Sequence, residues 1–339
     1  MTKPATISFA FIPLILFLVG WLGLATLFLT GLFSYFALNQ LRFGYSKALG
    51  VTLFVILTSS LGFGFFFFSK QAYVAIPKIV STTIPVMIEY AEKQGVELPF
   101  YDYDSLKQLA MDTVKEKMSG VGRYARDASL QIASLLIGFV VAISLFVDPR
   151  FDLRQRHHSE GEDLYSSTWN EISIRFQRFY ESFSTVIGAQ IVISTINTAL
   201  TAAFLLWSGF PHASVIIVLT FLFGLLPIIG NLMSNTLIVG VGLTISPQMA
   251  FISLAYLVVL HKLEYFLNSK IIGDRIKNPM WLTLLGLIIG EKLMGIPGMI
   301  LAPVVLHYVK VEATRSKMPN VKPSADKPEE TAPAPKPQA

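Results

Sequence analysis

The sequence contains no cysteine, and only 14% of its 339 residues are Asp, Glu, Lys or Arg. The absence of cysteine excludes disulfide bonds, thiolate zinc sites and cysteine nucleophiles. The shortage of charge excludes an ordinary soluble protein, because soluble domains carry about 25% charged residues. With 53% hydrophobic residues, the chain needs lipid to cover its surface. The net charge of +5 requires no nucleic-acid partner, since membrane proteins concentrate Lys and Arg in cytoplasmic loops.

Signatures of catalysis and of nucleotide binding are also missing. The sequence has no HExxH, GxSxG, GxGxxG or GxxxxGK[ST] motif. We therefore predict no enzyme, no catalytic residue, no cofactor and no ATP-driven pump. A polar segment does contain His157, His158, Glu160, Glu162 and Asp163, which could hold a metal ion. Such residues are common in polar loops, so no metal site is predicted.

Long stretches without charge predict the membrane-spanning helices of the first half. Thirty-eight residues separate Lys3 from Arg42, and one crossing needs about 20 residues, so two short paired helices fit best. No cleavage site for a signal peptide follows them, and we expect this segment to remain as an anchor. Further apolar runs cover residues 48–69 and 130–147. Between them lies a polar insert, which includes a predicted amphipathic helix between Ser105 and Gly120.

Basic residues predict the topology. The polar segment that ends at Glu181 is rich in arginine, which places it in the cytoplasm by the positive-inside rule. Counting spans backward puts the polar insert outside and the N-terminus inside. The Pro-, Lys- and Ala-rich C-terminal tail after Ala313 is then also cytoplasmic, and its composition predicts disorder.

The C-terminal half contains 80 residues, from Ser182 to His261, without a single Asp, Glu, Lys or Arg. Span five is expected at residues 183–207, and residues 249–267 must run from outside to the next basic cytoplasmic segment. The segment 213–245 must therefore return to its starting side, which predicts a helical hairpin broken near Pro227 and Gly230. Residues 280–309 must also return to the side from which they start, because both of their ends are flanked by basic cytoplasmic segments. This predicts a second hairpin, which is interrupted near Glu291 and Gly295 and enters from the opposite face.

The predicted fold is therefore an all-α polytopic membrane protein. It has about six full or short paired spans, two oppositely oriented broken helical hairpins and a small polar helical insert outside the membrane. The predicted divisions are residues 1–69 (paired helices and third span), 70–127 (external insert), 128–181 (fourth span and Arg-rich segment), 182–312 (transport block) and 313–339 (disordered tail).

Polar residues inside the transport block are candidates for a pathway. Glu264 could relay a proton or cation, or it could be an interfacial charge paired with Lys262 or Lys270. Asn231 and Asn235, four residues apart, could coordinate a polar solute or hold helices together. Interrupted helices are the best sequence pointer to a transporter's binding site. The predicted pathway comprises Pro227, Gly230, Asn231, Asn235, Glu264, Asn268, Glu291, Gly295 and Gly298.

Two other features have plainer interpretations. Glu291 and Lys292 are expected to form a solvated turn rather than gating charges deep in the membrane. Gly286 and Gly290 form a GxxxG pattern, which is typically a helix-packing device.

Three motifs together resemble a known family. The series Leu225-Leu-Pro-Ile-Ile-Gly230, His261-Lys-Leu-Glu-Tyr-Phe-Leu-Asn-Ser-Lys-Ile-Ile-Gly273 and Gly295-Ile-Pro-Gly-Met-Ile-Leu-Ala-Pro303 is similar to the autoinducer-2 exporters, also called PerM-type permeases. The resemblance implies a secondary transporter of the bacterial inner membrane that works without ATP. It implies export of autoinducer-2 or, in some branches, sodium(lithium)/proton antiport, and homo-oligomers that include pentamers. Many members carry proline where this chain has Asn231 and Ser269.

The leading hypothesis is an alternating-access transporter that exports a small polar solute such as autoinducer-2. The two opposed hairpins would meet near the midplane and hold the solute there. A sodium(lithium)/proton antiporter and a non-transporting membrane scaffold are the alternatives. The expected partners are a small polar solute or a monovalent cation or proton, the lipid bilayer, and further copies of the chain.

Overall fold

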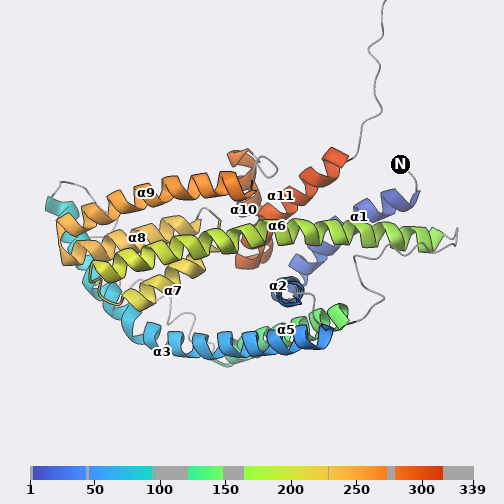
Figure 1. Ribbon diagram of the computed structural model, residues 1–339, viewed down its shortest axis with the longest axis horizontal. Coiled ribbons are helices and arrows are strands. Elements are labelled where there is room, and N and C mark those ends of the chain that lie inside the picture. The colour runs from blue at the N-terminus through green and yellow to red at the C-terminus, as the bar shows by residue number, and fades with distance from the viewer. Residues whose placement is uncertain are drawn as a thin grey trace, which may run out of the picture.

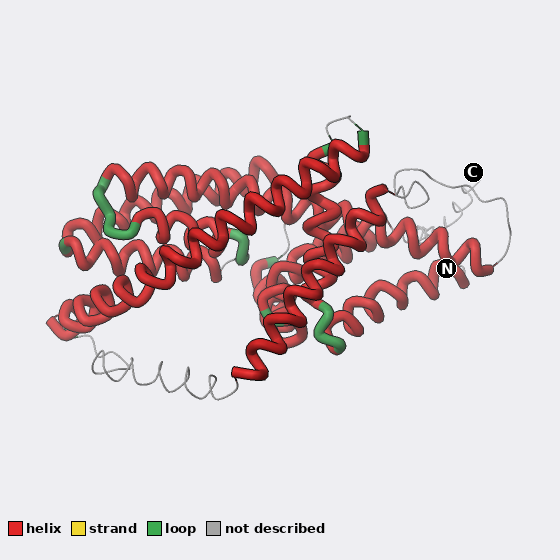
Figure 2. The backbone as a smooth tube through the Cα atoms, turned by 90° about the horizontal axis from the view of Figure 1, so that it is seen from below, coloured by secondary structure: helices red, strands yellow, loops and turns green. Residues whose placement is uncertain are grey.

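The computed structural model describes residues 3–42, 46–93, 95, 121–147, 164–227, 229–272 and 279–315. All regular structure in these residues is α-helical, which confirms the predicted class (Figure 2). The ten helices are α1 (Lys3–Trp21), α2 (Ala25–Leu41), α3 (Lys47–Lys93), α5 (Val121–Val147), α6 (Leu164–Trp207), α7 (Ala213–Gly224), α8 (Ile229–Ile245), α9 (Pro247–Ile272), α10 (Met280–Met294) and α11 (Ile296–Arg315).

Six of these helices are long and apolar enough to cross a membrane. They are α1, α3, α6, residues Ser129–Val147 of α5, residues Pro247–Leu267 of α9 and residues Ile296–Thr314 of α11. A helix satisfies its backbone hydrogen bonds internally, which hydrocarbon requires of any segment that it surrounds. Large apolar side chains such as Phe66 and Trp207 remain exposed on the isolated chain, as expected where lipid covers the protein. The prediction of a polytopic membrane protein is confirmed.

The 44-residue helix α6 runs through most of the length of the molecule, and α1, α7, α9 and α11 pack along it (Figure 1). Helices α1 and α11 pack along its first half, where Ile12 and Val304 share an apolar cluster with Phe183. Helices α7 and α9 pack against its second half, where Val215 and Leu257 share another cluster with Leu205, and α8 packs against α7 and α9. The two apolar clusters lie along different halves of α6, which contributes residues to both.

Helices α7 and α8 form an antiparallel hairpin because the chain cannot continue as a helix between them. Pro227 has no backbone N–H, and a Cβ atom at Gly230 would overlap the carbonyl of Phe223. A hydrogen bond of 3.1 Å from Ser234 Oγ to Thr220 Oγ1 joins the two arms. The break lies where the sequence predicts it.

Helices α10 and α11 form the second hairpin, which reverses at Gly295. This residue has φ of 64°, a conformation open to glycine, and its N–H donates to the carbonyl of Glu291 at 2.7 Å, which closes α10. On the two sides of the turn, Gly290 of α10 and Gly298 of α11 bring the backbones so close together that a Cβ atom on either residue would overlap the carbonyl of the other. Gly286 also faces α11, through Leu306, so both glycines of the GxxxG pattern pack between helices.

The two hairpins reach the middle of α6 from its opposite ends. At the end of α7, the carbonyl of Gly224 accepts a 2.5 Å hydrogen bond from Gln190 Nε2. At the end of α10, Met294 packs in the cluster that contains Ile187 and Ile191. The hydrogen bond from Gln190 therefore holds the end of α7 beside α6, where the candidate site lies.

Two helices extend beyond the expected spans. Helix α3 continues past Ser69 to Lys93, and α6 begins at Leu164 rather than near Phe183. Helix α2 packs closely on α5, where a Cβ at Gly138 would press on Thr30. The predicted amphipathic helix after Ser105 and the histidine-rich segment at 157–163 lie outside the described residues.

Candidate functional site

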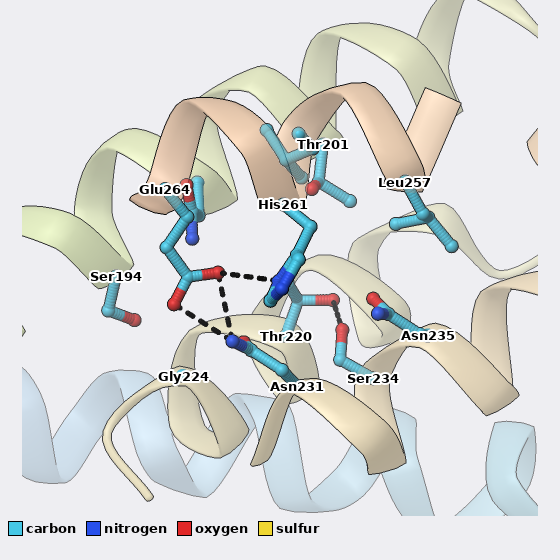
Figure 3. A pocket seen from close by; sticks show the side chains of 12 residues that line it. Ser194, Thr201, Thr220, Gly224, Asn231, Ser234, Asn235, Leu257, His261 and Glu264 are labelled. Atoms are coloured by element: carbon cyan, nitrogen blue, oxygen red, sulfur yellow. Dashed lines mark hydrogen bonds and ion pairs between the residues drawn. The ribbon is translucent and has the colours of Figure 1, made fainter. Parts of the chain in front are cut away.

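A small polar cavity lies between α6, α7, α8 and α9 (Figure 3). Its lining comes from the uncharged stretch between Ser182 and His261 and from Glu264, which follows that stretch. Its volume is about 20 Å³, and a cavity needs roughly 10–15 Å³ to hold a water molecule. The cavity therefore has room for about one water or one small ion. The lining residues are Ser194, Asn197 and Thr201 of α6, Thr220 and Gly224 of α7, Asn231, Ser234 and Asn235 of α8, and Leu257, Leu260, His261 and Glu264 of α9.

Glu264 supplies the carboxylate of this cavity. Its side chain is only 14% exposed, and Asn231 Nδ2 donates hydrogen bonds of 2.8 Å to both of its oxygens. His261 Nδ1 lies 4.0 Å from Oε2, and that ring is 67% exposed (Figure 3). Asn231 is a neutral partner, so it orients the carboxylate without cancelling its charge. The carboxylate keeps further lone pairs that can bind a cation or accept a hydrogen bond from a polar solute.

Two buried oxygen atoms on the side of α6 that lines the cavity have no hydrogen-bond partner among the described residues. Asn197 Oδ1 and Thr201 Oγ1 make no hydrogen bond within the described residues, and Thr201 is fully buried. Buried polar atoms are nearly always hydrogen-bonded, and an unpaired one costs about 1–3 kcal/mol. Both residues line the cavity. Their oxygens are therefore available to a bound water, cation or polar solute.

The neighbouring hydroxyls are already committed to the helices. Ser194 Oγ donates to the carbonyl of Phe221 at 3.0 Å, and Thr220 Oγ1 donates to the carbonyl of Ile216 at 2.8 Å. A Cβ at Gly224 would collide with Ser194, so glycine is needed for α7 to lie this close to α6. These contacts fix the cavity wall. The oxygens of Asn197 and Thr201, the amide of Asn235 and the remaining lone pairs of Glu264 are then available to a ligand.

The structure brings part of the predicted pathway together. Asn231, Asn235 and Glu264 line the cavity, and Pro227 and Gly230 form the turn beside it. Asn268 lies in α9 one turn beyond Glu264, and its side chain is outside the described residues, as is that of Lys270. The residues Glu291, Gly295 and Gly298 lie on the second hairpin and do not line the cavity. Glu291 is 47% exposed and pairs with Lys292 at 3.4 Å.

The polar side of α6 that lines the cavity is not predicted from the sequence. Ser194, Asn197 and Thr201 are spaced by three and four residues, so they share one face of a helix. The spacing was visible, but single hydroxyls and amides are common in membrane helices. Only the approach of α9 shows that this face opposes a carboxylate.

A second buried polar cluster lies near the other end of α6. The carboxylate of Glu312 on α11 accepts a hydrogen bond from Arg175 and two from Arg178, the latter at 2.9 and 3.0 Å. Arg175 Nε also donates to Ser8 Oγ at 2.5 Å, and its guanidinium carbon lies 3.4 Å from the ring centre of Phe9. The side chains of Arg175 and Glu312 are 4% and 9% exposed. This cluster ties α1, α6 and α11 together.

Comparison with known proteins agrees with this architecture. A model of the AI-2E transporter family matches residues 7–315, which include both hairpins and the polar cavity. The chain belongs to the AI-2E family of transporters. It is also 24% identical over 261 residues to YdbI of Bacillus subtilis (strain 168), a protein proposed to act in transport, over 74% of this chain and 71% of YdbI. Membership of the AI-2E family makes this chain a membrane transporter, and it confirms the resemblance inferred from the motifs.

Proposed function

We propose that this AI-2E family member is a secondary-active transporter that moves a small polar solute through the Glu264 cavity by alternating access. The observation that carries the proposal is the buried Glu264 carboxylate facing the unpaired oxygens of Asn197 and Thr201. Ionisable groups at membrane depth are costly and are retained mainly for function. The surrounding 80 residues supply no countercharge of their own.

The hairpins supply the means of opening. Backbone breaks inside a membrane are tolerated where they are buried in protein or line a wet cavity. The turn at Pro227 lies between Gly224 and Asn231 of the cavity lining. Met294, next to the turn at Gly295, packs against the apolar cluster that includes Ile187 of α6. Movement of one hairpin at a time would expose the cavity first to one face and then to the other.

Autoinducer-2 is the first candidate for the solute, because the family is named for transport of it. A cavity of about 20 Å³ is too small for an organic molecule, so the described conformation corresponds to a closed state. Export of such a solute requires the α7–α8 hairpin to separate from α6 or α9. The polar lining would then provide hydrogen bonds to its hydroxyl groups.

Flux through proteoliposomes tests the role of Glu264. We expect Glu264→Gln to reduce flux of the transported solute by roughly 10- to 150-fold, because a hydrogen bond to a charged group contributes about 1.5–3 kcal/mol. Glu291→Gln is the matched control, since this carboxylate is exposed and lies outside the cavity. Equal flux from both variants would remove Glu264 from the pathway, and no flux from the unaltered protein above that of protein-free vesicles would favour a scaffold without transport. A panel of autoinducer-type solutes and monovalent cations identifies the cargo.

Monovalent cation/proton antiport is a second candidate, favoured by the size of the cavity. Room for one water-sized particle beside a carboxylate and two unpaired oxygens suits a dehydrated cation that competes with a proton. We expect sodium or lithium to drive proton movement in vesicles only while Glu264 is intact. No proton movement at any pH on adding either ion would remove this candidate.

The proposed topology places both termini in the cytoplasm at the bacterial inner membrane, with the hairpins entering from opposite faces. Because the chain has no cysteine, single cysteines at Ser246 and Asn278 can be labelled without background. We expect an impermeant thiol reagent to label them from opposite sides of the membrane. Labelling of both from one side would contradict the two-hairpin topology. Homo-oligomers such as pentamers are expected from the resemblance, and mass measurement in detergent would count the subunits.

A further inference from the structure

An apolar groove runs between α1, α2, α5 and α6, well away from the Glu264 cavity. Its volume is about 380 Å³, within the range of roughly 300–1,000 Å³ that small-molecule sites occupy. Helix α2 contributes Leu27, Gly31 and Tyr35, which are four residues apart and so form one face. Val141 of α5 and Trp169 of α6 line the other walls. Nearly all of the lining is hydrocarbon or aromatic ring.

A polar cleft of about 320 Å³ adjoins this groove and shares two of its residues, Tyr35 and Tyr180. The two rings meet edge to face with centroids 4.9 Å apart. Asn39 Nδ2 donates to the Tyr180 hydroxyl at 3.2 Å. The polar cleft is otherwise lined by Gln40, Gln177, Glu181, Ser184 and Thr185. The character of the wall therefore changes from apolar to polar at the tyrosine pair.

The order of the two parts follows α2 along the chain. The apolar part covers residues 27–35, and the polar part begins at Tyr35 and includes Asn39 in the last turn. Arg42 follows that turn and opens the basic connection that ends at Lys47. A ligand that fills both parts must carry a long apolar portion joined to a compact polar head. That is the chemistry of a membrane lipid.

The charges in the polar cleft indicate the type of head group. Among the described residues that line it, Glu181 is the one ionisable acid or base at neutral pH, and it attracts an ammonium group. Asn39 already donates both of its amide hydrogens, to the Tyr35 carbonyl and the Tyr180 hydroxyl. Gln40 therefore supplies the amide donor for a phosphate. The positive charge of Arg42 follows two residues later. An ammonium next to a phosphate describes an ethanolamine phospholipid. An anionic head group would place its negative charge against Glu181.

The chain's own tail does not suit the groove. After Val321 the sequence contains no apolar residue other than alanine and proline, so this segment has nothing large enough to fill an apolar volume of this size. We propose that the continuous groove along α2, defined by its shared tyrosines Tyr35 and Tyr180, is a binding site for one phosphatidylethanolamine molecule of the surrounding bilayer. The acyl chain lies between α2, α5 and α6, and the ammonium lies at Glu181.

Blocking the apolar part tests the site. A Cβ at Gly31 would have no neighbour closer than 4.0 Å, so Gly31→Leu places its side chain in the groove without a forced clash at Cβ. Gly62→Leu is the matched control, because Gly62 lies in the apolar helix α3 with open space around it. Val141→Trp fills the groove from the opposite wall and serves if Gly31→Leu does not fold.

The readout is native mass spectrometry of full-length protein from vesicles of equal phosphatidylethanolamine and phosphatidylglycerol. We expect the unaltered protein and Gly62→Leu to retain phosphatidylethanolamine, and Gly31→Leu or Val141→Trp to lose it. Glu181→Gln should abolish the preference between the two lipids while keeping a bound lipid. Equal retention of the two lipids by the unaltered protein would overturn the proposal. Unchanged lipid retention in both Gly31→Leu and Val141→Trp would also overturn it. A changed subunit number in these variants with the same bound lipid would overturn it too, because the groove would then be a subunit interface.

Discussion

The two helical hairpins differ in how they are held against α6. The α10–α11 hairpin packs backbone against backbone at Gly290 and Gly298, and its second arm is fixed by the ion pairs of Glu312 with Arg175 and Arg178. The α7–α8 hairpin borders a polar cavity, and the carboxylate that contacts it, Glu264, meets a neutral amide. Glu312 is paired with two guanidinium groups, whereas Glu264 has no Lys or Arg partner among the described residues.

This difference suggests a division of labour. A fully paired buried charge has no capacity left for a ligand, and removing one partner is strongly destabilising. A buried carboxylate oriented by an amide keeps lone pairs for a cation or a polar solute. We therefore expect changes at the second hairpin to reduce stability and changes at the first to reduce transport.

The largest effect on stability is expected from Arg175→Met. The variant leaves Glu312 buried with a single partner, Arg178, and removes the contact with Ser8, so the free energy of unfolding should fall by about 3–5 kcal/mol. Intrinsic tryptophan fluorescence during thermal unfolding in detergent measures the change. The double variant Arg175→Met with Glu312→Met should recover part of the loss, because apolar replacement of a buried ion pair is often tolerated.

A second test concerns the glycine contact. Gly290→Ala would press a methyl group into the carbonyl of Gly298, so the two helices must separate, with an expected cost of about 1–3 kcal/mol. Gly64→Ala in α3 is the control, since a Cβ there meets nothing within 4 Å and alanine favours the helix by roughly 0.5–1 kcal/mol. Equal stability of the two variants would show that α10 and α11 tolerate separation, which would weaken the contrast between the hairpins.

Much of the fold follows from the distribution of charge and of helix breakers. The stretch without charge from Ser182 to His261 predicts several crossings, and Pro227 with Gly230 predicts the first hairpin, which α7 and α8 confirm. The reversal at Gly295 is predicted for the same reason, since glycine readily adopts positive φ.

The beginning of α6 is harder to predict. Arg175 and Arg178 mark a polar segment by composition, yet the side chain of Arg175 is 4% exposed. Its partner Glu312 is 137 residues away, and a single sequence contains no signal that pairs them. The candidate site shows the same limit. Glu264 and Asn231 stand out as polar groups among apolar ones, but their hydrogen bond depends on the packing of α8 against α9.

An intermediate effect is expected from Asn231→Ala. The variant removes both hydrogen bonds to Glu264 and leaves that carboxylate without its amide partner, at a cost of about 1–3 kcal/mol. Asn235→Ala is the matched control, because Asn235 lines the same cavity without a hydrogen bond to another described residue. Thermal unfolding compares the two. If Asn231→Ala lowered the free energy of unfolding as much as Arg175→Met, the contacts of the first hairpin would be as important for stability as those of the second.

The smallest change in stability is expected from Glu264→Gln, although this variant should have the largest effect on transport. Glutamine has nearly the same shape, and its side-chain oxygen can still accept a hydrogen bond from Asn231 Nδ2, so the free energy of unfolding should change by less than about 1.5 kcal/mol. Removing a buried charge also removes its desolvation cost, which offsets the weaker hydrogen bond. Unfolding and solute flux are measured on the same preparation. A variant that unfolds as readily as Arg175→Met would make Glu264 a structural residue, whereas normal unfolding with lost flux assigns its charge to transport.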